Sequence, residues 1–176
     1  MLLADAMLEY RDRRPTAERF FGQAFRLQSE GRFADAEDFY RRSIALYPTS
    51  EAYTFLGWCL SFQDRHEEAI QLCKRGIELD PEYGNPYNDI GAYLIQLGRV
   101  EEAIPWLERA KAARRYDCHH YPFYNLGRVF EMLGKFDEAL REYRGAIDRA
   151  KERNVEYRHA ITAAARVEAI LKRSRA

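Results

Sequence analysis

Residues 87–110, YNDIGAYLIQLGRVEEAIPWLERA, decide the fold. Tyr87, Ile90 and Leu94 share one side of a predicted helix, because steps of three and four residues return to the same face. Gly98 interrupts this run, and a second amphipathic run follows with its inner positions at Ala103, Leu107 and Ala110. Two short helices joined by a tight turn form a hairpin that cannot bury its apolar face alone. The stretch therefore predicts neighbouring copies of itself.

Four copies are present. The small residue early in each second helix recurs at spacings of 33, 34 and 36 residues, as Ala36, Ala69, Ala103 and Ala139. Three further columns follow the same register: an aromatic residue (Phe20, Tyr53, Tyr87, Phe123), a small residue four positions later (Ala24, Gly57, Gly91, Gly127), and a turn residue (Gly31, Asp64, Gly98, Gly134). A period of about 34 residues is typical of helix–turn–helix repeats.

These columns resemble the tetratricopeptide repeat (TPR) family over residues 17–153. The resemblance implies an all-α fold, an α-α superhelix or TPR solenoid of four helix–turn–helix repeats with an extra N-terminal helix and a C-terminal capping helix. The expected bounds are 1–14 for the N-terminal helix, 17–49, 50–83, 84–117 and 120–153 for the four repeats, and 154–173 for the capping helix.

The recurring small residues in the first helices are explained by helix packing. Where helices cross at about 8–10 Å, a bulky side chain would force the two backbones apart. We therefore expect Gly57, Gly91 and Gly127 to lie where the paired helix comes closest.

The helix ends are predicted from capping residues and prolines. Pro15 is expected to end the N-terminal helix, with Thr16 capping the next one, while Ser50 and Asn85 are expected to cap later helices. Pro105 lies early in its helix and is expected to bend it.

The two terminal helices each carry an apolar stripe. The N-terminal stripe is Leu3, Ala6, Met7 and Tyr10. Three interpretations of this helix are open: a cap on the first repeat, a homodimer contact and a plug in the groove. The C-terminal stripe is Tyr157, Ala160, Ile161, Ala164, Val167 and Leu171, as expected of the cap that stacked repeats require.

Composition narrows the function. The 176 residues contain 28 basic and 28 acidic side chains, and the zero net charge argues against a nucleic-acid partner. No apolar run is long enough to cross a membrane, and the N-terminus does not read as a signal peptide. The three cysteines lack CxxC spacing and read as free thiols. We expect a cytoplasmic protein.

The concave side of such a stack is lined by the first helices. Its aromatic candidates for peptide binding are Phe21, Phe25, Phe55 and Trp58, with Phe62 on the same stripe, and its other candidates are Asn88, Tyr124, Asn125 and Arg128. Aromatic rings can anchor the side chains of a peptide, and Asn amides can both donate to and accept from its backbone. The alternative is that the aromatic residues pack against the N-terminal helix or a neighbouring repeat.

The sequence offers no enzymatic constellation. Cys118, His119 and His120 are adjacent in a linker and lack the spacing of metal ligands. No Gly-rich phosphate loop or nucleophile elbow is visible. We expect no catalytic residues, no cofactor and no metal.

The resemblance implies a non-catalytic protein–protein interaction module, a scaffold or adaptor that binds a peptide segment of another protein in the concave groove. A dedicated chaperone for one secreted or assembled client, similar to the translocator chaperones of type III secretion, is the alternative. One TPR subclass grips a C-terminal carboxylate with Lys, Asn and Arg, but the groove positions of the first two repeats supply no lysine, so this clamp is not expected.

Overall fold

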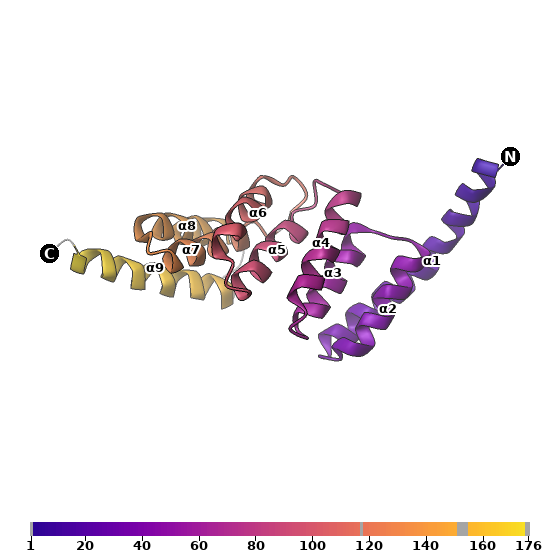
Figure 1. Ribbon diagram of the computed structural model, residues 1–176, viewed down its shortest axis with the longest axis horizontal. Coiled ribbons are helices and arrows are strands. Elements are labelled where there is room, and N and C mark those ends of the chain that lie inside the picture. The colour runs from indigo at the N-terminus through magenta and orange to yellow at the C-terminus, as the bar shows by residue number, and fades with distance from the viewer. Residues whose placement is uncertain (1, 117, 151–154, 175–176) are drawn as a thin grey trace. The chain divides into compact units, whose positions relative to one another are not determined.

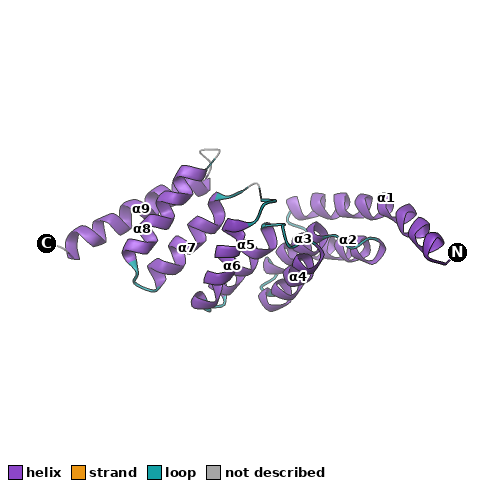
Figure 2. Ribbon diagram, turned by 90° about the horizontal axis from the view of Figure 1, so that it is seen from above, coloured by secondary structure: helices purple, strands orange, loops and turns teal. Residues whose placement is uncertain are grey.

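The computed structural model describes residues 2–116, 118–150 and 155–174, and these contain nine helices and no strand (Figures 1 and 2). The helices are α1 (Leu2–Ser29), α2 (Phe33–Leu46), α3 (Ser50–Ser61), α4 (His66–Leu79), α5 (Asn85–Gln96), α6 (Val100–Ala112), α7 (His120–Met132), α8 (Phe136–Arg149) and α9 (Val155–Ser174). The predicted all-α fold of helical hairpins is confirmed.

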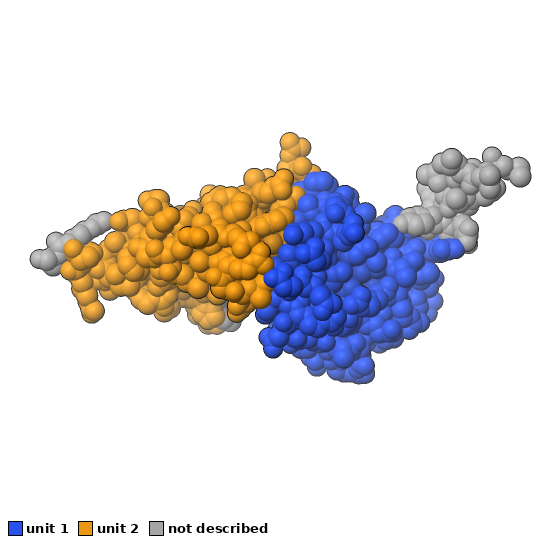
Figure 3. Space-filling view, in the orientation of Figure 1, with its two compact units in different colours: residues 1–81 blue, residues 82–176 orange. Residues whose placement is uncertain are grey.

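The chain divides into two compact units, coloured blue and orange in Figure 3. Unit 1 is Met1–Pro81 and contains α1 to α4; unit 2 is Glu82–Ala176 and contains α5 to α9. In unit 1 the hairpins α1–α2 and α3–α4 pack through α2 and α3. In unit 2 each helix packs on the next one along the chain, and α5 also packs on α7. Each unit thus has its own stack of hairpins.

The turn column has the backbone that it requires. Gly31, Gly98 and Gly134 have φ angles of 76°, 73° and 71°, and Asp64 has a φ of 58° as the one non-glycine residue with positive φ among those described. The amide of the following residue donates back across each turn, as Arg32 N does to Leu27 O at 2.9 Å. This left-handed turn satisfies carbonyl groups at the helix end and reverses the chain.

The small column lies at the closest approach of the paired helices, as predicted. A Cβ atom at Gly57 would lie 3.1 Å from the carbonyl oxygen of Ala69, and one at Gly127 would lie 2.5 Å from the ring of Tyr143. A Cβ atom at Gly91 would overlap the side chain of Leu107. The opposing alanines Ala36, Ala69, Ala103 and Ala139 are fully buried.

The prediction that Pro15 ends a separate N-terminal helix is wrong. Helix α1 runs without a break from Leu2 to Ser29 with Pro15 inside it, so Thr16 caps nothing. A proline removes one backbone hydrogen bond, but a helix continues when the turns around it are held by other contacts. Two residues after the proline, the hydroxyl of Ser43 on α2 donates to the carbonyl of Ala17 at 2.9 Å. The side chains of the predicted N-terminal stripe lie outside the described residues.

Two caps are placed one residue earlier than predicted. Thr49, in extended conformation, caps α3 by accepting from the amide of Ala52 at 3.1 Å, so Ser50 is the first helical residue. Gly84 precedes α5, and Asn85 begins the helix. The hydroxyl of Thr49 reaches the third helical amide, which is the usual geometry of an N-cap. Pro105 lies inside α6 and does not end it, and the predicted bend stays a prediction.

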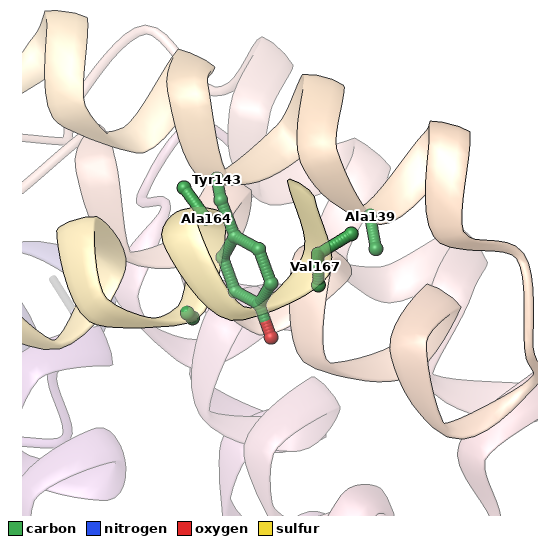
Figure 4. Packing of buried hydrophobic residues seen from close by; sticks show 5 residues of the cluster. Ala139, Tyr143, Ala164 and Val167 are labelled. Carbon is green, nitrogen blue, oxygen red and sulfur yellow. The ribbon is translucent and has the colours of Figure 1, made fainter. Parts of the chain in front are cut away.

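Helix α9 covers the end of unit 2. Its buried residues Ala163, Ala164 and Val167 form a cluster with Ala139 and Tyr143 of α8 (Figure 4). The predicted stripe holds at Ala160, Ala164 and Val167, but Ile161 is 42% exposed and does not belong to it. Ala163 takes part instead, because the face that meets α8 is turned away from Ile161.

Candidate functional site

The predicted contact residues divide equally between the two units. Phe21, Phe25, Phe55 and Trp58 lie on α1 and α3 of unit 1, and Asn88, Tyr124, Asn125 and Arg128 lie on α5 and α7 of unit 2. All eight are therefore on the first helices of the hairpins. Each unit presents its own candidate surface.

The aromatic surface of unit 1 is a connected row of rings, which we define as Phe21, Phe25, Phe55, Trp58 and Phe62. The ring centroid of Phe55 lies 5.4 Å from that of Phe21, 5.6 Å from that of Phe25 and 6.3 Å from that of Trp58. Trp58 and Phe62 follow at 5.3 Å. The near-perpendicular ring planes are the favourable edge-to-face arrangement of aromatic pairs.

The rings of this row differ in how much of them remains exposed. Phe25, Trp58 and Phe62 keep 48%, 41% and 54% of their surface exposed, while Phe21 and Phe55 are partly buried. Phe21 and Phe55 rest on Tyr40 of α2, which is fully buried. Packing inside the unit therefore accounts for two of the rings and leaves the other three as an apolar surface.

One aromatic neighbour was missed by the sequence reasoning. Phe33 begins α2, and its ring is stacked on Phe62 at 4.6 Å with an interplanar angle of 5°. It belongs to a second helix, so the rule that first helices line the surface excluded it. The position of Phe33 directly after the turn could have indicated that its ring lies near the first helices.

The polar row of unit 2 is a chain of hydrogen bonds, which we define as Asp89, Asn88, Asn125 and Arg128. The amide Nδ2 of Asn125 donates to Oδ1 of Asn88 at 3.0 Å, joining α7 to α5. Asn88 Nδ2 donates to a carboxylate oxygen of Asp89 at 3.3 Å, and Arg128 Nη1 donates to Oδ1 of Asn125 at 3.3 Å. The row therefore runs from a carboxylate through two amides to a guanidinium.

The two asparagines are less available than the sequence suggested. Asn88 is 8% exposed and Asn125 is 6% exposed, and each already uses one donor and one acceptor within the row. Only their remaining hydrogen-bonding capacity could serve a ligand. Tyr124 is partly buried and packs on the α8–α9 cluster, with its ring 5.8 Å from Tyr143.

A tyrosine hydroxyl anchors the first helix of the outer hairpins in a matching way. Tyr40 donates to Gln28 at 2.6 Å in unit 1, and Tyr143 donates to Glu131 at 2.7 Å in unit 2. Glu131 also accepts two hydrogen bonds from Arg166 of α9, and those bonds lower the pKa of its carboxyl group. These contacts join α1 to α2 and α7 to α8 and α9, so the first helix of each of these hairpins is bonded to the helices that pack on it.

A small pocket of about 270 Å³ lies beside Phe21 in unit 1. Its lining combines apolar and charged side chains, from Arg14, Ala17, Glu18, Phe21, Ser43, Tyr47, Thr49 and Glu51. Arg14 and Glu18 pair across one helical turn at 2.8 Å. The pocket extends the apolar row toward a charged rim.

In the described part of the chain the potential metal ligands are dispersed, and two of the three thiols are buried. No three His, Cys, Asp or Glu residues there are grouped as metal ligands would be. Cys59 and Cys73 are fully buried, and burial raises the pKa of the Cys59 thiol to about 11. Such a thiol is protonated at neutral pH and a poor nucleophile. None of the helices formed by the described residues is long and apolar enough to span a membrane.

The stacked hairpins, the left-handed turns and the small columns define a helical repeat protein of the class that serves as protein–protein interaction scaffolds, whose members are generally non-catalytic. Family models described as tetratricopeptide repeat match residues 50–83 and 82–152. The chain belongs to the tetratricopeptide repeat family.

Individual relatives agree with this assignment. Protein bimA of Emericella nidulans is 29% identical over 97 residues, which is 54% of this chain and 12% of that protein. A chain of the APC/C hetero-tetramer Cut9-Hcn1 has a TM-score of 0.79 at 16% identity, covering 97% of this chain and 33% of that one. YrrB, described as a TPR protein with an unusual peptide-binding site, has a TM-score of 0.64 at 20% identity, covering 87% and 76%. The chain spans a quarter or less of the curated relatives that it matches.

Proposed function

We propose that this chain is a scaffold or adaptor that binds peptide segments of partner proteins, and that the aromatic surface of unit 1 and the polar row of unit 2 are each, by themselves, a contact surface. The proposed repeats are residues 17–49, 50–83, 84–117 and 120–153. The first helix of each repeat would then contribute contact residues, as first helices do in stacked hairpins.

The exposed rings of Phe25, Trp58 and Phe62 are the observation that carries the proposal. Large aromatic side chains are seldom left exposed side by side without a partner, and they are enriched among the residues that dominate binding energies. Each ring here is supported by another ring, so little side-chain freedom would be lost when a ligand binds. The description of YrrB as a peptide-binding TPR protein is consistent with this use of the fold.

The polar row is the contact surface that we propose for unit 2. Its amides and its guanidinium are groups that bind the backbone and polar side chains of an extended peptide. Because disordered segments lose conformational freedom on binding, we expect an affinity in the micromolar range, with Kd about 1–100 μM.

Matched variants test the proposal. Peptides selected on the wild-type protein from a random dodecapeptide phage library are measured against Trp58→Ala and Arg128→Ala by fluorescence anisotropy. We expect losses of about tenfold or more, since truncating a residue at the centre of an interface commonly removes that much affinity. Leu79→Ala and Arg141→Ala are the controls, because both residues are exposed on second helices of the same units and should leave binding unchanged.

Folded variants that keep full affinity for every selected peptide would refute the assignment of these surfaces. Identification of the proteins that co-purify with the chain from its source distinguishes the scaffold from the chaperone. Several weak partners would indicate a scaffold, whereas one protein at fixed stoichiometry would indicate the alternative, a chaperone for a single client.

A further inference from the structure

Asp89 is a carboxylate without a counter-charge in the part of unit 2 that is described. Its single hydrogen bond there is the one that it accepts from Asn88 at 3.3 Å. It forms no ion pair with a described Lys, Arg or His residue, although such pairs are frequent elsewhere on these helices, as between Arg99 and Glu102 at 2.6 Å. An acidic group of this kind, held among protein atoms, is uncommon because charged side chains there are usually paired.

The direction of the polar row fixes Asp89 as an acceptor. Arg128 at the other end can only donate, so Asn125 turns its oxygen toward Arg128 and its amide toward Asn88. Asn88 then turns its own amide toward Asp89. Two asparagines thus separate the carboxylate from the nearest cation of the row, and the charge of Asp89 is not neutralised by it.

The surroundings of Asp89 have already removed much of its water. The residue is only partly exposed, and burial raises the pKa of its carboxyl group to about 7, against a smaller opposing effect of the hydrogen bond from Asn88. Among the elements that meet α5, the α6–α7 connection presents Tyr116, whose buried hydroxyl is neutral, and α7 presents Arg128. A carboxylate in this state gains more from an incoming cation than a hydrated one would, because its own desolvation occurred on folding.

We infer that Asp89 binds the side chain of a lysine or arginine in the partner segment, and that this residue selects basic peptides for unit 2. The inference rests on the proposed function, since it presumes that a peptide lies over α5 and α7. Charge complementarity favours a basic side chain as the ligand of Asp89. The carboxylate accepts a hydrogen bond from Asn88, has no cationic partner among the described residues, and is partly withdrawn from solvent.

Peptides from the dodecapeptide selection test the inference when each is compared with a copy that has norleucine in place of lysine, or citrulline in place of arginine. On the wild-type protein we expect the neutral copy to bind about tenfold to a hundredfold more weakly, the range for a hydrogen bond to a charged group. On Asp89→Asn the two copies should bind equally, because the asparagine keeps the acceptor for Asn88 but removes the charge. Asp148→Asn, an exposed acid of α8, is the control and should keep the wild-type preference.

A pH series gives a second readout. The affinity of the basic peptide for the wild-type protein should rise between about pH 6 and pH 8, as Asp89 ionises, and should stay flat for Asp89→Asn. Peptides that depend on Arg128 but show no preference for a basic residue would overturn the inference and leave the proposed function standing. A selection without any peptide that depends on Arg128 or Trp58 would overturn both.

Discussion

Asp89 is a residue whose surroundings disfavour its ionised form, although an aspartate in water is ionised at neutral pH. Its pKa of about 7 means that the folded chain favours the protonated form, whereas the unfolded chain releases that proton near pH 3.8. Stability is therefore unaffected below about pH 4, decreases as the pH rises toward 7, and carries the full penalty above it. An uncharged asparagine at this position would avoid the penalty, and a binding role for the carboxylate would explain why the chain has an aspartate.

The first prediction follows from this decrease in stability as the pH rises. Asp89→Asn should raise the free energy of unfolding by roughly 1–3 kcal/mol at about pH 8, and the gain should vanish near pH 4. Urea denaturation at both pH values measures it. A gain that is the same at the two pH values would show that the carboxyl group is not the cause.

Asp64 is the other residue in an unfavourable state. It occupies the turn column with a φ of 58°, where the other three turns have glycine. A side chain in the left-handed region costs about 1 kcal/mol relative to glycine. Its neighbour Arg65 pairs with Glu37 of α2 and with Glu68 of α4.

Asp64→Gly should therefore stabilise the protein by roughly 0.5–1 kcal/mol, because the strain is relieved, although glycine also gains freedom in the unfolded chain. The matched change Gly98→Ala should destabilise it by about 1 kcal/mol, since Gly98 has a φ of 73°. Thermal denaturation followed by circular dichroism compares the two. Shifts of the same sign would contradict the assignment of this column.

At the scale of the element, the distance between paired helices depends on one small residue. Gly91 of α5 faces Leu107 of α6, and any side chain there would overlap it. A glycine within a helix costs about 1 kcal/mol relative to alanine, so its use at three of the four repeats reflects packing. The helix propensity is sacrificed where the backbones approach each other.

Gly91→Leu should destabilise the protein by roughly 1–3 kcal/mol through overpacking against Leu107. Gly22→Leu is the control, because Gly22 lies in α1 with open space around its backbone. Denaturant midpoints measure both. An equal effect of the two changes would mean that helix propensity, and not the contact with α6, decides the result.

At the scale of the whole molecule, a stack of hairpins leaves an apolar side at its end that must be covered. In unit 2 this side is formed by Ala139 and Tyr143, and α9 covers it with Val167, which is fully buried (Figure 4). The ion pair between Arg166 and Glu131 fixes the helix at its rim, with distances of 2.8 and 2.9 Å.

Val167→Ala should lower the free energy of unfolding by roughly 1–2 kcal/mol, because it leaves a cavity under α9. Ile161→Ala on the same helix should change it by less than about 0.5 kcal/mol, since Ile161 is 42% exposed. Chemical denaturation of the pair tests whether α9 is a packed cap. A larger effect at Ile161 would refute the burial pattern described here.

The sequence by itself determined the class of the protein. The period of the columns, the left-handed turns and the small residues at the crossings are local signals; glycine occupies three of the four turns, and a small residue lies at each of the four crossings. Because a hairpin buries its apolar face only against another hairpin, their recurrence was sufficient to predict the fold. The aromatic surface was predictable for the same reason, since Phe25 and Trp58 fall on the helix face that remains after the core positions are assigned.

The tertiary structure alone decided the state of each polar residue. Asn88 and Asn125 are 37 residues apart, and their mutual hydrogen bond depends on how α5 and α7 meet. The course of α1 through Pro15, and the contact of its Ala17 with Ser43 of another helix, are likewise features of the folded chain. The raised pKa of Asp89 comes from burial, against the opposing hydrogen bond from Asn88, and a one-dimensional pattern records neither of them. Periodicity specifies which side of a helix is apolar, whereas burial, partner and protonation are properties of the assembled neighbours.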